Sequence, residues 1–324
     1  MAARRTSLAR GGRAIFELCG AGLDSVSFRQ QLRAQLRRLL PFDAYCVNTV
    51  DPQTRLITSS IGDGLSSSAA RRLFELEELG TDFNRLTELT CVATLHEATY
   101  GDVLRSQRMR ELFAPLGFCD ELRAALVVDG HCWGYLHLFR ESQPFTVSEV
   151  RDIEQVRSHV GAALRSACLV GDRRAALPAP LVVLLGRESR AEEWRAAFAN
   201  DVGGTLPHPI LTVAARVRHG ALANGRYRSP RGDWLSLHGH ALGEDVALTL
   251  SAPHARELAP LWFLAHGLSA RERQVGALLL EGYANDAIAN RLGISLYTAK
   301  DHVKLILHKT GAPSRLALLA ELYG

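Results

Sequence analysis

The chain has 324 residues, of which 47% are hydrophobic and 22% charged, and its net charge is +4. This length predicts two or three domains, and the composition is that of a globular protein. No apolar run approaches the roughly 20 residues that span a bilayer, and no signal-peptide pattern follows the basic N-terminus. We therefore expect a cytoplasmic protein without membrane contact.

Residues 1–12 predict a flexible basic tail, and a first folded region follows it. Asp24 or Ser25 is placed to cap a helix over residues 25–40, and the turn Asp51–Thr54 separates two strands of a hairpin. The elements expected in this region are the strands 44–50 and 55–61, helices at 67–79 and near 107–113, and strands 122–128 and 132–140.

A long helix closes this region. Thr146 and Glu149 have the spacing of a capping box at its start. An apolar stripe runs along the helix, and we expect it to be buried on the region's own sheet; the alternative is a dimer seam. The stripe consists of Val150, Ile153, Val156, Val160 and Leu164.

The order helix–strand–strand–helices–strand–strand–helix resembles a GAF domain over residues 13–170. The segment "WGYLHLFR", followed by "FTVSEV" and a long helix, is similar to the usual end of such domains. The resemblance implies a sheet with a pocket under the connecting helices, often used to sense a small molecule. It leaves the effector unknown.

A charged, Ala- and Pro-rich segment, residues 171–180, predicts a linker. Residues 181–256 then resemble a degenerate PAS domain, a second sensing or signal-transmitting unit. The elements expected here are the strand "LVVLLG", helical segments at 191–200 and 209–219, and strands within "GRYRSPRGDWLSLHGHAL" and "DVALTLS".

Enzyme motifs are absent from the sequence. Lys300, Lys304 and Lys309 are the only lysines, so a P-loop and a kinase-type early lysine are both excluded. His238 and His240, and the set His131, Cys132 and His137, have no third ligand at metal-site spacing. We interpret them as half-buried histidines and expect no catalysis, no metal and no cofactor.

All six cysteines lie in the first 168 residues, and none are spaced as CxxC. We interpret them as small buried apolar residues, and a redox or haem-ligating role is the alternative. Their distribution indicates that the two halves of the chain are different units.

The last sixty residues predict four short helices with a helix-turn-helix. Ser269 and Glu272 form a capping box, and Gly282 suits a left-handed cap. Asn285 is expected to cap the second helix, and Gly293 to turn into the third, capped by Ser295. Ser314 is expected to cap a fourth helix with Leu316, Leu319 and Leu322 facing inward.

The third helix, Leu296 to about Lys309, has two opposed faces at 100° per residue. Its core side is Leu296, Ala299, Val303, Ile306 and Thr310, and Lys309 lies elsewhere, where a cation suits the helix dipole. The opposite side gathers Tyr297, Lys300, Asp301, Lys304 and His308 within about half a turn. Lysine suits phosphate oxygens and guanine, although charged faces are more often merely solvated.

Residues 268–322 closely resemble the C-terminal DNA-binding domain of LuxR-type transcriptional regulators, through "LSARERQV" and "LLLEGYANDAIANRLGISLYTAKDHVKLILHKTGAPSR". The resemblance implies a domain that dimerises through its last helix and binds promoter half-sites of double-stranded DNA with its third. It places the DNA contacts on Thr298, Lys300, Asp301 and Lys304. Ala299 and Tyr283 depart from the family pattern, and we expect Tyr283 to be exposed.

The sequence thus predicts an α+β, multidomain protein: a GAF-like domain, a PAS-like domain and an all-α four-helix domain over residues 262–324. We interpret it as a one-component DNA-binding regulator and homodimer, with Tyr297 and His308 added to the four implied contacts and RNA polymerase as a partner. The alternative is a small-molecule or redox sensor whose tail is only a protein-interaction module.

Overall fold

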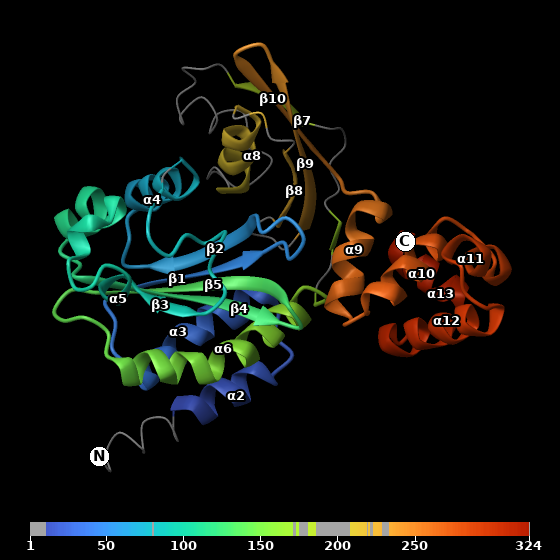
Figure 1. Cartoon of the computed structure of the whole chain (residues 1–324), viewed down its shortest axis with the longest axis horizontal. Coiled ribbons are helices and arrows are strands. Elements are labelled where there is room, and N and C mark those ends of the chain that lie inside the picture. Colours follow the sequence, from blue (N-terminus) through green and yellow to red (C-terminus); the bar gives the residue numbers. More distant parts are fainter. Residues whose placement is uncertain are drawn as a thin grey trace. The chain divides into compact units, whose positions relative to one another are not determined.

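The computed structural model describes residues 11–79, 81–170, 173–174, 181–185, 208–218, 220, 223–228 and 233–323. The chain forms two compact units, residues 1–251 and 252–324 (Figure 1). The predicted flexible tail lies mainly outside the described residues, as do most of the predicted linker and the predicted helix at 191–200.

The first unit is built on a five-stranded antiparallel sheet with the order β2-β1-β5-β4-β3. The predicted hairpins are confirmed: β1 pairs with β2 around the Asp51–Thr54 turn, and β4 with β5. The short β3 was not predicted. The strands are β1 (Ala44–Val50), β2 (Ile57–Asp63), β3 (Val92–Thr94), β4 (Asp120–Val128) and β5 (His131–Arg140).

Three helices lie on one side of this sheet, and the first of them packs on the other two (Figure 1). They are α2 (Arg13–Cys19), α3 (Ser25–Leu39) and α6 (Val147–Ala167), of which α2 was not predicted. The capping boundaries are as expected, with Asp24 capping α3 and Thr146 capping α6. The α6 stripe packs on its own sheet: a Cβ on Gly134 of β5 would lie 2.7 Å from Leu164.

Shorter helices lie over the opposite face. They enclose a cluster of aromatic and aliphatic side chains around Phe113, Phe118 and Phe139. Because this face is covered by short segments rather than one long helix, it leaves room for a cavity, described below. The helices are α4 (Ser67–Leu79), α5 (Leu95–Ala98), η2 (Val103–Arg105), the π-helix η3 (Met109–Phe113) and η4 (Ala114–Leu116).

A second sheet follows in the same unit, with the order β6-β9-β10-β7 and with β8 paired to β9. The predicted strands and the helix near residues 209–219 are present. Helix α8 packs on β8, β9 and β10. The elements are β6 (Arg173–Arg174), β7 (Leu181–Leu185), α8 (His208–Arg218), β8 (Ala223–Arg228), β9 (Asp233–Leu242) and β10 (Asp245–Ser251).

The turn between β1 and β2 joins the two sheets. Leu56 of this turn belongs to the apolar core of the second sheet, beside Ile210 and Tyr227. Arg226 of β8 pairs with Asp51 at 2.7 Å, and both side chains are buried. The turn therefore connects two strands of the first sheet and also packs against the second.

Two interpretations of polar residues need correction. Cys91 is exposed, so the six thiols are not all buried; the described residues form no disulfide. His240 is exposed and His137 fully buried, so the histidines are not uniformly half-buried.

No helix in the described ranges is long and apolar enough to cross a membrane.

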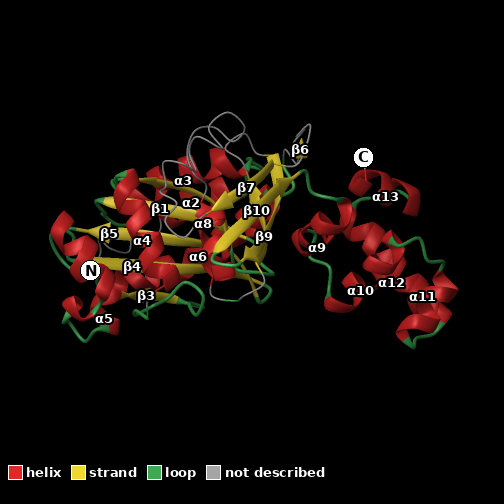
Figure 2. Ribbon diagram, turned by 90° about the horizontal axis from the view of Figure 1, so that it is seen from above, coloured by secondary structure: helices red, strands yellow, loops and turns green. Residues whose placement is uncertain are grey.

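The second unit consists of helices and loops over its described residues, 252–323 (Figure 2). The fold is therefore mixed, with one antiparallel sheet and one mostly antiparallel sheet followed by an all-α end. The helices are α9 (Ala255–Ala265), α10 (Ala270–Leu280), α11 (Asn285–Leu292), α12 (Leu296–Thr310) and α13 (Arg315–Tyr323).

Candidate nucleic-acid interface

Helices α10 and α12 begin after their predicted capping residues, and α11 ends at its predicted glycine. Ser269 and Glu272 form the capping box of α10. Helix α11 ends at Gly293, whose φ of 62° is left-handed, and Ser295 caps α12 by accepting from the Thr298 N–H at 3.0 Å. Three residues, 293–295, therefore make the turn between two helices that pack on each other.

The exposed face of α12 carries most of the predicted DNA-contacting residues. Tyr297, Lys300, Asp301, Lys304 and His308 are all exposed, while Ala299, Ile306 and Thr310 are buried. Thr298 is half-buried, and its hydroxyl is hydrogen-bonded to Ser295 Oγ at 2.9 Å. Within the described part of the chain, neither Lys300 nor Lys304 makes an ion pair, so both ammonium groups are available to a ligand.

Lys309 has a different environment from the other two lysines. Its Nζ lies 2.7 Å from Glu272 Oε2 and donates to the Gly267 carbonyl at 3.3 Å. Burial raises the pKa of Glu272, but hydrogen bonds from Lys309 and the Ser269 N–H outweigh burial and lower the pKa overall. Lys309 therefore holds α12 against the start of α10 instead of serving only the helix dipole.

Several apolar and capping assignments were wrong. Leu296 is exposed because it lies in the first turn of α12, at the edge of the apolar arc. Leu316 is 77% exposed and Leu318 is buried instead, because α13 docks on α9 through an i, i+4 face, which also buries Leu322 as predicted. Asn285 is the first helical residue of α11 and does not cap it.

Tyr283 is half-buried, although we predicted it to be exposed. The Arg291 guanidinium lies over its ring at 4.1 Å and donates to its hydroxyl at 2.7 Å. Arg315 donates to its backbone carbonyl. These two arginines are therefore occupied within the unit, which leaves Lys300 and Lys304 as the cations on the predicted face of α12.

Helix α9 was missed, because the predicted domain began at residue 262, in the middle of this helix. Leu258, Leu261, Trp262 and Phe263 are buried, and α9 packs on α10 and α13. A Cβ on Gly276 of α10 would meet the Phe263 ring at 2.8 Å. The apolar segment "LAPLWFLA" is the signal that could have predicted this helix.

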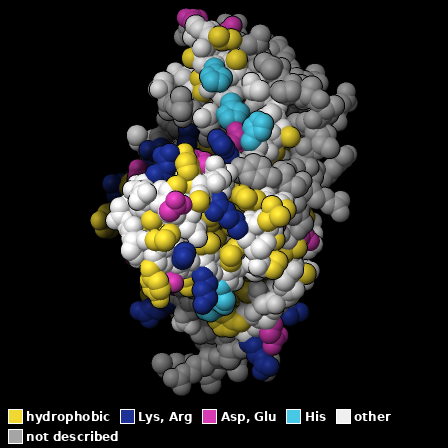
Figure 3. All heavy atoms as spheres, turned by 90° about the vertical axis from the view of Figure 1, so that its right-hand side faces the viewer, with side chains coloured by type: hydrophobic (Ala, Val, Ile, Leu, Met, Phe, Trp, Pro, Cys, Tyr) yellow, Lys and Arg dark blue, Asp and Glu magenta, His cyan; other side chains and the backbone are white. Residues whose placement is uncertain are grey.

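Basic side chains are dispersed on the visible surface. In Figure 3 the Lys and Arg side chains of the described residues lie singly or in small groups among apolar and polar ones. This agrees with the small net charge of +4 and means that binding to a polyanion depends on local placement.

A cavity of about 240 Å³ lies in the first unit, on the sheet face opposite α6. Strands β1, β2, β4 and β5 supply its floor, and α4 and residues 86–87 supply its walls. In the described ranges no group of three or more His, Cys, Asp or Glu is placed to hold a metal ion.

The geometry of residues 270–310 defines a helix-turn-helix, with α12 in the position of the second helix. Residues 266–321 match the family model described as bacterial regulatory proteins, luxR family. The chain therefore carries a LuxR-family helix-turn-helix domain over these residues.

Similarity to solved structures is weaker. The VqsR LBD domain from Pseudomonas aeruginosa is 19% identical with a TM-score of 0.35, over 53% of this chain and 100% of that one. Escherichia coli SdiA is 15% identical with a TM-score of 0.36, over 100% and 97%. A GAF domain/HD domain protein from Geobacter sulfurreducens is 18% identical with a TM-score of 0.34, over 48% and 98%. These scores are too low to carry an argument, and no curated protein matches the chain.

Proposed function

We propose that the protein is a sequence-specific transcriptional regulator that places α12 in the major groove of promoter DNA. The observation that carries this proposal is the pair Lys300 and Lys304, exposed one turn apart and unpaired within the described residues. The same helix uses Lys309 internally. Helix α12 has 15 residues and is therefore about 22 Å long. The major groove of DNA is about 12 Å wide and admits an α-helix.

The residues on this face would divide two tasks. Lys300 and Lys304 would neutralise phosphates or donate to guanine, and Tyr297, Thr298 and His308 would contact the backbone or base edges. Asp301 is a carboxylate in the same row, which would repel phosphate and accept from cytosine N4. We therefore assign Asp301 to the choice of sequence rather than to affinity.

A homodimer is part of this proposal. Two exposed cations per copy give a salt slope of only about −1.8, so one copy would bind weakly. A two-fold pair on half-sites about one helical turn apart would double that slope. Leu316, exposed on α13, is an apolar residue that a second copy could cover.

The first unit would sense a small-molecule effector, with its sheets acting as the GAF-like and PAS-like regions of a one-component regulator. The cavity supports this assignment. The β1–β2 turn supports a route for the signal, because Arg55 lines the cavity while Asp51 pairs with Arg226 of the second sheet. We assign the protein to the cytoplasm, with RNA polymerase as a partner and no enzymatic activity.

A gel shift with the full chain tests the DNA-binding part. We expect salt-sensitive binding to a pool of double-stranded DNA and loss of at least tenfold in affinity for the variant K300A/K304A. Arg256→Ala is the matched control, since it removes an exposed positive charge from α9 of the same unit.

The second candidate is a protein-interaction module, favoured by the exposed apolar side chains Leu305 and Leu316. Absence of any shift at low salt would support this candidate and contradict DNA binding.

A further inference from the structure

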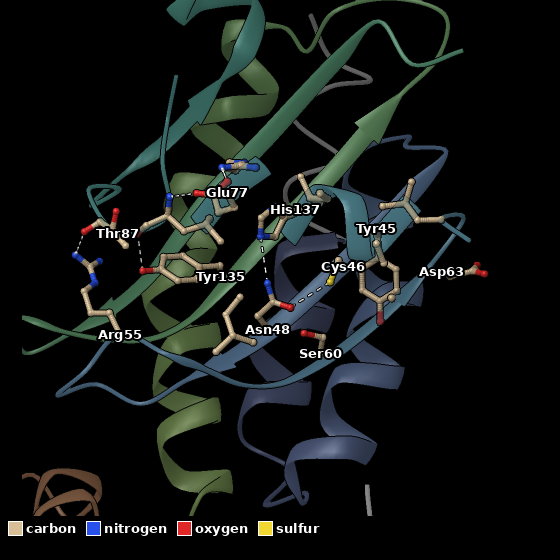
Figure 4. A pocket seen from close by; sticks show the side chains of 17 residues that line it. Tyr45, Cys46, Asn48, Arg55, Ser60, Asp63, Glu77, Thr87, Tyr135 and His137 are labelled. Atoms are coloured by element: carbon tan, nitrogen blue, oxygen red, sulfur yellow. Dashed lines mark hydrogen bonds and ion pairs between the residues drawn. The ribbon is translucent and has the colours of Figure 1, made fainter. Parts of the chain in front are cut away.

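The floor of the cavity is a polar patch on one face of the sheet. Gly134 of β5 faces α6, so Tyr135 and His137, which alternate with it, face the cavity. Asn48 of β1 lies directly between Ser60 of β2 and Tyr135 of β5 in the strand register. A hydroxyl, an amide and a phenol therefore stand in one row across three strands (Figure 4).

The hydrogen bonds of this floor leave one amide donor free. Burial lowers the pKa of His137, so its imidazole is neutral, and Glu121 is ionised because Arg108 and Arg123 lower its pKa despite burial. Nδ1 of His137 then donates to Glu121 at 3.3 Å, so Nε2 accepts from Asn48 Nδ2, also at 3.3 Å (Figure 4). The second Asn48 N–H has no protein acceptor among the described residues.

A second donor is also unused. The Arg123 side chain is 1% exposed and lines the cavity, and its Nη2 has no hydrogen-bond partner in the part of the chain that the structure describes. Buried donors without acceptors are costly, so a ligand oxygen near this floor would recover hydrogen bonds that the protein alone does not make.

The charges around the cavity cancel. Four cationic and four anionic side chains line it or belong to the ion-pair network that reaches it, so an ionised ligand would enter without a counter-charge. They are Arg33, Arg55, Arg108 and Arg123 against Asp63, Glu77, Asp82 and Glu121. The floor therefore favours an uncharged ligand that brings an acceptor.

The remaining walls are apolar and limit the size of the ligand. Ile57, Leu73 and Leu86 line them, and the Tyr135 ring is held rigidly because its hydroxyl donates to the Leu86 carbonyl at 2.6 Å. An apolar cavity of about 150 Å³ is known to hold benzene. The present volume of about 240 Å³ accordingly fits one ring with a short substituent, roughly ten non-hydrogen atoms in all.

We propose that this cavity binds an uncharged single-ring aromatic molecule with one carbonyl oxygen, which accepts from the free Asn48 N–H while the ring packs against Tyr135 and Leu73. This ligand class would be the effector for the sensing role that we propose for the first unit. The biological relevance of the ligand rests on that proposed function. Binding itself is independent of DNA.

Three probes with the same number of non-hydrogen atoms separate the effect of the carbonyl oxygen from the effect of ligand charge. Acetophenone is uncharged and has a carbonyl, benzoate is anionic, and cumene has no oxygen. We expect titration calorimetry with the full chain to give acetophenone an affinity at least tenfold above that of each other probe. Benzoate binding as tightly as acetophenone, or no binding of acetophenone, would overturn the proposal.

Two variants locate the site. Asn48→Leu keeps the side-chain shape without the amide, so acetophenone should lose at least tenfold in affinity while cumene is unaffected. Ala70→Phe on α4 should fill the cavity and abolish binding of both probes, whereas Ser68→Ala, exposed on the same helix, should change neither. Full acetophenone affinity in Ala70→Phe would contradict this location even if Asn48→Leu fails to fold.

A gel shift without probe, run on the same preparations, separates this proposal from the DNA-binding one. Lys304→Ala should weaken DNA binding and leave acetophenone binding intact. If wild type shifts DNA but ignores acetophenone, the ligand proposal alone fails.

Discussion

Lys304 and Lys309 provide a matched test, because two lysines five residues apart on α12 are expected to have opposite roles. Lys304 is exposed and unpaired among the described residues, whereas Lys309 bonds Glu272 and the Gly267 carbonyl. Replacing each by alanine removes the same charge from the same helix. The two variants should therefore differ only through what each side chain contacts.

The magnitudes follow from these contacts. Loss of one phosphate contact in each copy of a dimer reduces the magnitude of the salt slope by about 1.8. When the salt concentration rises from 50 to 200 mM, the loss of affinity should therefore be about tenfold smaller for Lys304→Ala than for wild type. Lys309→Ala should keep the wild-type slope. It should lower the local free energy of unfolding by about 1–2 kcal/mol, since the Lys309 side chain is 34% exposed and the pair is partly screened.

Two measurements check this pair. Gel shifts over a series of salt concentrations give the slopes, and amide hydrogen exchange of α10 and α12 gives the local stability. Equal slope changes in the two variants would refute the reasoning, as would faster exchange in Lys304→Ala than in Lys309→Ala.

The other predictions concern sequence choice, pH and the junction between the sheets. Asp301→Ala should change the selected DNA consensus with little loss of affinity, as read by selection from a random pool. Because the folded-state pKa of Glu272 is lowered, its contribution to stability is present above the ordinary glutamate pKa of about 4.3 and is lost as pH falls below it; Glu272→Gln should flatten that part of the stability profile. Asp51→Ala should lower the free energy of unfolding of the first unit by roughly 3 kcal/mol in urea, because it removes one side of a buried ion pair with Arg226.

Each of these three has a contrary outcome. An unchanged consensus would remove Asp301 from base selection, and acid unfolding equal in wild type and Glu272→Gln would show that another carboxylate dominates. For the junction, Arg165→Ala is the control, since its partner Asp129 is exposed and the pair should contribute less than about 1 kcal/mol. Equal losses in the two variants would contradict the distinction between a buried and an exposed pair.

Local signals predicted much of the fold. The capping residues Asp24, Thr146, Ser269 and Ser295 are confirmed because each side-chain oxygen bonds a backbone N–H only three or fewer residues away. The turn at Gly293 is confirmed for a similar reason, since a left-handed φ favours glycine wherever the turn occurs. Such interactions are complete within a few residues, so the sequence alone contains them.

The predictions of burial were wrong where the position of a side chain depends on contacts with residues outside its own helical turn. Leu316 and Leu318 are both compatible with an inward position, and only docking of α13 on α9 determines that Leu318 is buried. Tyr283 is half-buried because Arg291, eight residues away, stacks on it. The domain boundaries and the DNA contacts stay predictions, because they depend on associations outside one local segment.

The sequence by itself determined the helix-turn-helix and the opposed faces of α12, since a period of 3.6 residues fixes which side chains share a face. Only the tertiary structure decided that Lys309 is tied to Glu272, that Leu56 belongs to the core of the second sheet, and that Asn48 and His137 meet on one cavity floor. The physical reason is range: propensity and capping act within a few residues, whereas ion pairs and cavities bring together groups that are tens of residues apart.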